Sequence, residues 1–170
     1  MELQPVLENG RYRIEPLKMI HKDALLAIAS DPLLWDQHPA KERATKEGFD
    51  EFFEQSLTSG GALAILDKET GSIVGSSRFQ LHEDDPKAVQ IGWTYLDRNY
   101  WGIGANKDIK AMMIEHAFSY MDRVLLYIDH QNFRSQAAAR KIGAVQVTKE
   151  QYPLVYRDRP DYTTFIIEKN

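Results

Sequence analysis

One stretch of the sequence constrains the fold more than any other, because its order of elements allows few arrangements. Residues 88–96 have the apolar character of a strand, residues 97–104 form a loop with two glycines, and residues 106–121 place apolar side chains at helical spacing. An apolar strand over residues 124–129 follows, and then a helix over residues 132–142. A strand–helix–strand crossover is normally right-handed and places its two strands parallel. We therefore expect one parallel strand pair inside the sheet.

The rest of the chain predicts antiparallel strands and two more helices. Apolar spacing favours helices over residues 19–30 and 45–57. Further strands are expected at residues 11–15, 62–67, 73–81, 145–148 and 163–168. The fold class is therefore α/β of mixed α+β character, with a central mixed, mostly antiparallel sheet of about six to seven strands and helices on both faces. We expect a single domain over residues 1–170.

The composition excludes several classes of function. A net charge of -4 argues against a nucleic-acid binder, which needs clustered lysine and arginine. Because the chain has no cysteine, it forms no disulfide, no thiolate zinc site and no cysteine nucleophile, and we expect no bound metal. No run approaches the length of about 18 apolar residues that a membrane span needs. Residues 1–10 lack the pattern of a signal peptide, so we expect a cytoplasmic protein.

The loop between the strand and the helix has the chemistry of a phosphate-binding turn. Gly102 and Gly104 allow the backbone to turn tightly and to approach a ligand closely. The first amides of the following helix have no intrahelical partner, and the helix dipole favours an anion there. Two alternatives stay open at this point. The loop is an ordinary tight turn, or it belongs to a dinucleotide-binding unit, whose pattern needs a third glycine where Lys107 stands.

A second motif follows the strand at residues 124–129. Its members match the signature Asn-x-x-Ser/Ala…Lys-x-Gly, and they are Asn132, Ser135, Lys141 and Gly143. With both motifs in this order, the sequence resembles the GNAT superfamily of acetyltransferases. The Tyr-Trp-Gly-x-Gly form of the loop is similar to that of one branch, the ribosomal-protein N-terminal acetyltransferase-like enzymes of the RimJ/RimL type. The strong match covers residues 90–144, and the order of elements extends it more weakly to the whole chain.

The resemblance implies a GNAT fold and an N-acetyltransferase that depends on acetyl-CoA. The acetyl group would pass to a primary amine by direct attack through a tetrahedral intermediate, without a covalent enzyme intermediate. The expected partner is an amine-bearing small molecule or a peptide N-terminus, and a homodimer is left open. The residues expected to bind the cofactor are Leu96, Asp97, Arg98, Trp101, Gly102, Ile103, Gly104, Ala105, Asn106, Asn132 and Ser135.

The resemblance also implies roles in catalysis. A backbone N–H near Tyr95 or Leu96 would stabilise the oxyanion. Asn132 would bind the pantetheine arm, and Ser135 would donate a hydrogen bond to the departing sulfur. The alternatives carry equal weight: Asn132 is a helix N-cap, and Ser135 is a polar residue in the first helical turn.

Two residues depart from the family pattern. Many members carry a glutamate as general base where this chain has Gln90, which cannot take a proton at neutral pH. Many carry a tyrosine as general acid where this chain has Ala139. These departures leave a second hypothesis, a CoA-binding module without catalytic activity. The candidate bases are Asp97, Asp129 and His130, alongside a chain of water molecules.

We expect the acceptor to bind between the first two helices and the segment that joins the last two strands. The candidates to line this site are Trp35, His38, Arg78, Trp93, Tyr152, Tyr156 and Arg157. For the aromatic residues the alternative is core packing, which we favour for Trp93.

Overall fold

A single mixed sheet organises the computed structural model, which describes residues 1–157 and 159–169. In this part of the chain eight strands lie in the order β1-β2-β3-β4-β5-β6-β8-β7. Their bounds are β1 Leu7–Glu8, β2 Tyr12–Pro16, β3 Ala62–Asp67, β4 Ser72–Leu81, β5 Ala88–Leu96, β6 Arg123–Asp129, β7 Val145–Gln146 and β8 Tyr162–Glu168. Only the pair β5–β6 is parallel. The mixed, mostly antiparallel sheet is thus confirmed, and the short strand β1 is an addition to the prediction.

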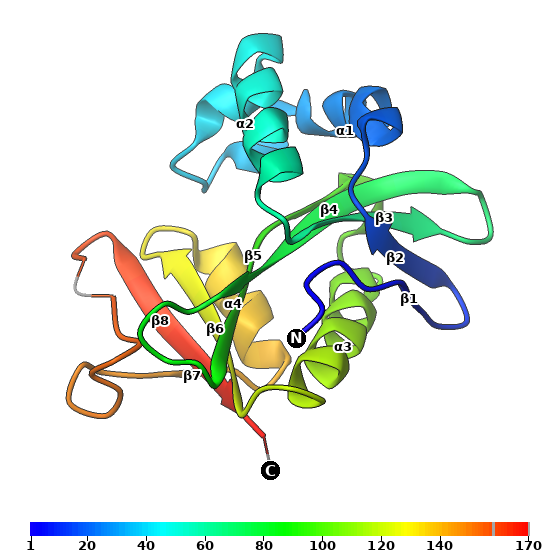
Figure 1. Ribbon diagram of the computed structural model, residues 1–170. Coiled ribbons are helices and arrows are strands. Elements are labelled where there is room, and N and C mark those ends of the chain that lie inside the picture. The colour runs from blue at the N-terminus through cyan, green and yellow to red at the C-terminus, as the bar shows by residue number, and fades with distance from the viewer. Residues whose placement is uncertain (158, 170) are drawn as a thin grey trace.

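Helices cover both faces of the sheet, as predicted. The four α-helices of the described residues are α1 Lys22–Ala29, α2 Lys46–Thr58, α3 Ala105–Phe118 and α4 Phe133–Lys141. Four short 3-10 turns of the described residues precede these helices or connect them: η1 Met19–His21, η2 Pro32–Trp35, η3 Lys41–Ala44 and η4 Arg98–Tyr100. In Figure 1, α1 and α2 lie above the sheet, and α3 and α4 lie on its other side.

The alternation of side chains along each strand builds a separate core on each face. On the α3 side, Ile109 and Met113 pack in one cluster with Leu63 and other strand residues. On the α1/α2 side, the aromatic residues of α2 pack in another cluster, which includes Ala62 and Tyr95. Neighbouring strand residues therefore face opposite helices, and Tyr95 and Leu96 point to opposite faces of the sheet.

The two parallel strands separate soon after they begin. The ladder between β5 and β6 pairs only Ala88–Gln90 with Arg123–Leu125. Beyond this point β5 continues along β4, and β6 continues along β8. Figure 1 shows the two strands running apart. The second half of β5 therefore has one edge without a strand partner, and its backbone groups face the gap between β5 and β6.

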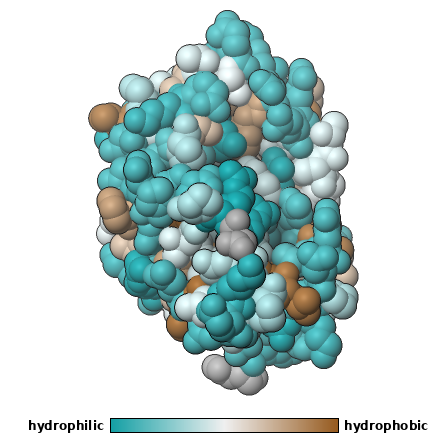
Figure 2. All heavy atoms as spheres, turned by 90° about the vertical axis from the view of Figure 1, so that its left-hand side faces the viewer, coloured by the Kyte–Doolittle hydropathy of each residue, from teal (hydrophilic) through white to brown (hydrophobic). Residues whose placement is uncertain are grey.

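One face of the molecule is mainly hydrophilic. Figure 2 shows apolar residues scattered over it. Scattered apolar side chains of this kind are normal for a protein surface. Within the described ranges, no helix combines the length and the apolar character needed to cross a lipid bilayer.

Candidate functional site

A β-bulge marks the place where β5 leaves β6. In the ladder between β4 and β5, Arg78 pairs with Gly92 and Ser76 pairs with Tyr95, so two residues of β5 stand opposite one residue of β4. One of the two is Trp93, whose φ of 52° lies in the left-handed region. Such a conformation is strained for a bulky residue and is often found at functional sites. The bulge bends β5 at the start of the gap.

The loop after β5 brings the start of α3 to the wide end of the gap. Gly102 and Gly104 have φ values of 76° and 89°, which favour glycine, and a Cβ added at either would meet no atom within 4 Å. The first backbone hydrogen bond into α3 runs from the Asp108 N–H to the Gly104 carbonyl oxygen at 3.1 Å. The preceding amides of the helix therefore lack a backbone acceptor. With the helix dipole, this open turn fits an anionic phosphate group.

Several side chains of the loop hold the loop itself. The Asp97 carboxylate accepts a hydrogen bond from the Asn99 N–H at 2.8 Å. Arg98 forms an ion pair with Asp31, with 2.5 Å between Nε and Oδ2. The Trp101 indole N–H donates to the Leu96 carbonyl oxygen at 3.1 Å. The side chain of Ala105 is buried in the core, and the side chain of Ile103 is exposed. We therefore expect both residues to contact a ligand of the turn mainly through their backbone atoms. Their predicted role in cofactor binding stays a prediction.

The start of α4 lies across the gap from the loop. Asn132 is buried, and its Oδ1 accepts a hydrogen bond from the Ser135 N–H at 3.1 Å. This contact confirms Asn132 as the N-cap of α4. Its Nδ2 and the hydroxyl of the half-buried Ser135 have no hydrogen-bond partner among the described residues. Both groups therefore remain available to a ligand in the gap.

The contacts of the three candidate bases do not identify any of them as the general base. Asp97 is the cap described above, and the Asp129 carboxylate accepts from the Gln131 N–H at 2.8 Å. His130 is exposed, and its Nδ1 lies 3.2 Å from the carbonyl oxygen of Asp161. Gln90 stands in the place of the family glutamate, and its Oε1 accepts a hydrogen bond from Arg157 at 3.4 Å.

The candidates for the acceptor site gather only in part. The Trp35 ring lies 5.5 Å from that of Tyr95 and 5.4 Å from that of His38. Burial and the nearby Arg43 lower the pKa of His38 to about 4, so this imidazole is neutral at pH 7. Burial also raises the pKa of the Tyr95 phenol, which therefore stays protonated. Tyr152 packs elsewhere, against the small cluster around β8.

Two further residues of the site escaped the sequence analysis. Arg43 lies in η3, with its guanidinium carbon 4.0 Å from the centroid of the Phe52 ring. Lys110 is buried in α3, with its Nζ 2.5 Å from the Thr94 Oγ1 and 3.4 Å from the Ser77 Oγ. Burial lowers the pKa of Lys110 to about 7. The sequence signal for Lys110 was its position three residues before Met113, on the apolar face of the helix.

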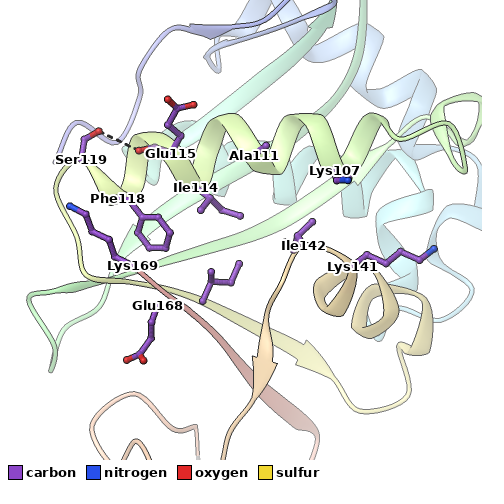
Figure 3. Close-up of a pocket in the computed structure, with 11 residues that line it drawn as sticks. Lys107, Ala111, Ile114, Glu115, Phe118, Ser119, Lys141, Ile142, Glu168 and Lys169 are labelled. Carbon is purple, nitrogen blue, oxygen red and sulfur yellow. Dashed lines mark hydrogen bonds between the residues drawn. The ribbon is translucent and has the colours of Figure 1, made fainter.

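A surface hollow lies away from these groups. It has a volume of about 820 Å³ and lies between α3, the end of α4 and the end of β8 (Figure 3). Ala111, Ile114 and Phe118 line it from α3, and Lys141 and Ile142 line it from the other side. None of the loop glycines or the first residues of α4 takes part. Because this hollow contains none of these residues, we take the gap between β5 and β6 as the candidate site.

A comparison with known families agrees with this site. The sequence model of the family described as "Acetyltransferase (GNAT) domain" matches residues 11–145. This range includes the bulge, the glycine loop and α4. No protein of curated function matches the chain significantly in sequence.

Solved structures resemble the chain over nearly its whole length. A protein described as an acetyltransferase from T. thermophilus has 26% identity and a TM-score of 0.71, with 96% of this chain and 89% of that chain covered. A ribosomal-protein-serine acetyltransferase from Vibrio cholerae has 15% identity and a TM-score of 0.73, with 99% and 100% covered. The Microcin C7 self immunity acetyltransferase MccE, solved with acetyl-CoA and AMP, has 18% identity and a TM-score of 0.73, with 99% of each chain covered.

Proposed function

Because the chain belongs to the GNAT acetyltransferase family, we propose that it transfers an acetyl group from acetyl-CoA to a primary amine, as an enzyme of the RimJ/RimL branch. The observation that carries this proposal is the early end of the β5–β6 ladder at Gln90 and Leu125. It opens the sheet between a phosphate-binding turn and the start of α4. The acceptor is the amine of a small molecule or of a peptide N-terminus.

The residues around the gap suit acetyl-CoA, which supplies an activated acetyl group as a thioester. The free amides at the start of α3 would receive its pyrophosphate. The unpaired edge of β5 offers backbone hydrogen bonds to the amide groups of its pantetheine arm. On the other side, the Asn132 Nδ2 would bind the same arm, and the Ser135 hydroxyl would donate a hydrogen bond to the sulfur. Both of these groups lack a hydrogen-bond partner within the described residues.

The chemistry requires a neutral amine, because an ammonium group cannot attack a thioester. Gln90 cannot remove the proton, and it holds Arg157 instead. We propose that water at the open face of the gap takes it. A backbone N–H at Tyr95 or Leu96 would then stabilise the oxyanion. Tyr95 would contribute through its backbone, since its ring packs in the core of the α1/α2 face beside Trp35 and Phe52.

An assay of thiol release tests this function directly. Since the chain has no cysteine, every free thiol in the reaction comes from CoA. The protein is incubated with acetyl-CoA and a panel of amines and short peptides, and we expect thiol release that depends on the amine. Acetyl-CoA, but not NAD, should also raise the melting temperature. Binding of CoA without turnover of any amine would support the non-catalytic module instead.

A further inference from the structure

Two arginines on the α1/α2 face lie beside the gap without an acidic partner. Arg78 belongs to β4 and Arg43 belongs to η3. Six other arginines of the described residues have a carboxylate within 4.0 Å, as Arg98 has Asp31 at 2.5 Å. Within the described residues no carboxylate oxygen lies within 4.0 Å of a nitrogen atom of Arg43 or Arg78.

Arg78 is deeply buried for an unpaired cation. The residue is 7% exposed, and its Nη2 donates to the Ser56 Oγ at 2.7 Å. Its guanidinium carbon lies 4.3 Å from the centroid of the Trp93 ring, and its Nε has no hydrogen-bond partner. Burying a charge without a partner is costly. A bound anion would provide the missing partner.

The second cation stands close to the first. The guanidinium carbon of Arg43 lies over the Phe52 ring, at 4.0 Å, and Arg78 bonds Ser56. Phe52 and Ser56 are four residues apart on α2, so they share one side of the helix at a spacing of about 6 Å. Burial and repulsion from Arg43 lower the pKa of Arg78 to about 10. The two guanidinium groups are therefore close enough to repel each other.

This pair also lies next to the candidate site. Arg78 pairs in the sheet with Gly92, at the bulge, and the Phe52 ring beneath Arg43 lies 6.0 Å from the Tyr95 ring. The partners of Gly92 and Tyr95 on β4, Arg78 and Ser76, are two residues apart, which corresponds to about 7 Å along the sheet. Arg78 also lines a hollow of about 590 Å³ between α2 and β4, where the exposed Glu83 is the carboxylate on the rim. This hollow borders Arg78 but not Arg43.

We propose that the acceptor amine also carries an anionic group, a carboxylate or a phosphate, which binds between Arg43 and Arg78. This inference rests on the proposed function, because it names the class of amine that the enzyme takes. The span of about 7 Å along the sheet suits a molecule of the size of an amino acid. Its anion neutralises both cations, and its amine reaches the gap between β5 and β6.

Matched pairs of acceptors test the preference in the wild-type enzyme. The first pair is β-alanine and β-alaninamide, and the second is O-phosphoethanolamine and ethanolamine. We expect kcat/KM to be about ten- to a hundredfold higher for the anionic member of at least one pair, as for a charge-assisted contact. The pair with the larger ratio distinguishes carboxylate from phosphate. Equal values within both pairs would overturn the proposal.

Substitution of the arginines locates the preference. In Arg78→Met and Arg43→Met the ratio of kcat/KM between the anionic and the neutral member of each pair should fall to about one. The control is Arg140→Met, on α4, where the guanidinium lies over Phe165 and bonds Gln146. It should keep the preference. An equal loss for both members of each pair in the arginine variants would mean that these side chains serve only the fold.

Calorimetry separates this inference from the function on which it rests. The four amines are titrated into the enzyme in the presence of CoA. If an anionic amine binds the wild type and not Arg78→Met, yet no amine is acetylated, the inference stands and the proposed function fails. If amines are acetylated but no anionic amine binds better than its neutral analogue, the function stands and the inference fails.

Discussion

The two faces of the sheet offer different chemistry to the same gap. On the α3/α4 face the groups that we propose to bind the ligand are mainly backbone amides, placed by Gly102, Gly104 and the starts of two helices. On the α1/α2 face they are side chains from separate segments, such as Arg43 and Arg78. A site built from backbone amides needs glycines at fixed spacing in the sequence. A site built from side chains of separate segments needs no local sequence pattern. Changes on the α1/α2 face can therefore alter the acceptor while the cofactor side stays intact.

The largest effect should come from a change of backbone on the cofactor side. Gly104→Val places a β-branched residue at a φ of 89°, where the turn cannot keep its shape. The amides at the start of α3 then no longer converge on the pyrophosphate. Loss of two charge-assisted hydrogen bonds, at about 1.5 kcal/mol each, corresponds to roughly a hundredfold rise in the Kd for CoA. Titration calorimetry measures it.

The matched control is a glycine with the same strain in another place. Gly71 has a φ of 70° in the turn between β3 and β4, and a Cβ there meets no atom within 4 Å. Gly71→Val should lower the melting temperature as Gly104→Val does, with no change in CoA affinity. If both variants bind CoA like the wild type, the turn does not hold the cofactor.

The next effect separates the two residues at the start of α4. Ser135→Ala should lower kcat about ten- to a hundredfold and leave the KM for acetyl-CoA nearly unchanged, because its hydrogen bond forms mainly to the departing thiolate. Asn132→Ala should raise that KM and also cost about 1 kcal/mol of stability, because the N-cap is lost. Steady-state kinetics and thermal unfolding measure these changes.

Asn132→Asp sharpens the assignment, because aspartate keeps the acceptor of the N-cap but lacks the NH2 group. It should raise the KM for acetyl-CoA at unchanged stability. The control for Ser135 is Ser119→Ala, whose hydroxyl bonds Glu115 at the far end of α3. Full activity of Ser135→Ala would leave this serine as a polar residue of the first helical turn.

The sequence predicted the elements of the cofactor side closely because each has a local signal. The strand at residues 88–96 coincides with β5, and the helix at residues 132–142 differs from α4 by one residue at each end. Strand β1 went unnoticed because two residues carry no periodicity. The sequence predicted neither a helix nor a strand over residues 33–44, where the fold has two 3-10 turns, and so the position of Arg43 carried no signal.

Contacts between segments that lie far apart in the sequence could not be predicted, because they form only when the chain folds. The side chain of Trp101 was assigned to the cofactor from its place in the loop. The structure shows its indole bonded to Leu96 and covered by the guanidinium of Arg134, at 4.2 Å from the ring centroid. Arg134 belongs to the other motif, and only the fold brings the two together. The β-bulge at Trp93 likewise depends on pairing with β4, which no local pattern reveals.

A third test examines the buried amine of Lys110, which contacts the hydroxyls of Ser77 and Thr94 beside the bulge. Lys110 has a folded-state pKa of about 7, below its value of about 10.5 in the unfolded chain, so the unfolded state binds more protons between these values. The free energy of unfolding should therefore rise with pH from 7 to 9, by up to about 1.4 kcal/mol per pH unit. Below pH 7 this dependence ends. In Lys110→Met the rise should be absent.

Denaturant unfolding at several pH values gives the comparison. The groups that face the Lys110 amine are the hydroxyls of Ser77 and Thr94, and no charged group contributes to its shift. The control is Lys107→Met, an exposed lysine of the same helix, which should follow the wild type. Parallel curves for Lys110→Met and the wild type would mean that this amine stays charged in the fold.

The smallest effect should come from the residue that joins the two faces. Arg134, in α4, forms an ion pair with Asp36, with 2.9 Å between Nη1 and Oδ1, and donates to the Leu34 carbonyl oxygen at 3.0 Å. Its guanidinium lies over Trp101 in the glycine loop. One side chain thus connects the segment between α1 and α2 with both elements of the cofactor side.

Arg134→Met should raise the KM for acetyl-CoA and the KM for the acceptor together, by about two- to fivefold, since a partly exposed ion pair contributes at most about 1 kcal/mol. The value of kcat should change little, because Arg134 contacts only protein groups that position the two sides. Arg159→Met, which removes an exposed ion pair with Asp161, is the control and should leave both constants unchanged. A change in the KM for acetyl-CoA alone would assign the segment between α1 and α2 to the cofactor side. If neither KM changes, Arg134 does not couple the two faces, and the cofactor side and the acceptor side are positioned independently of each other.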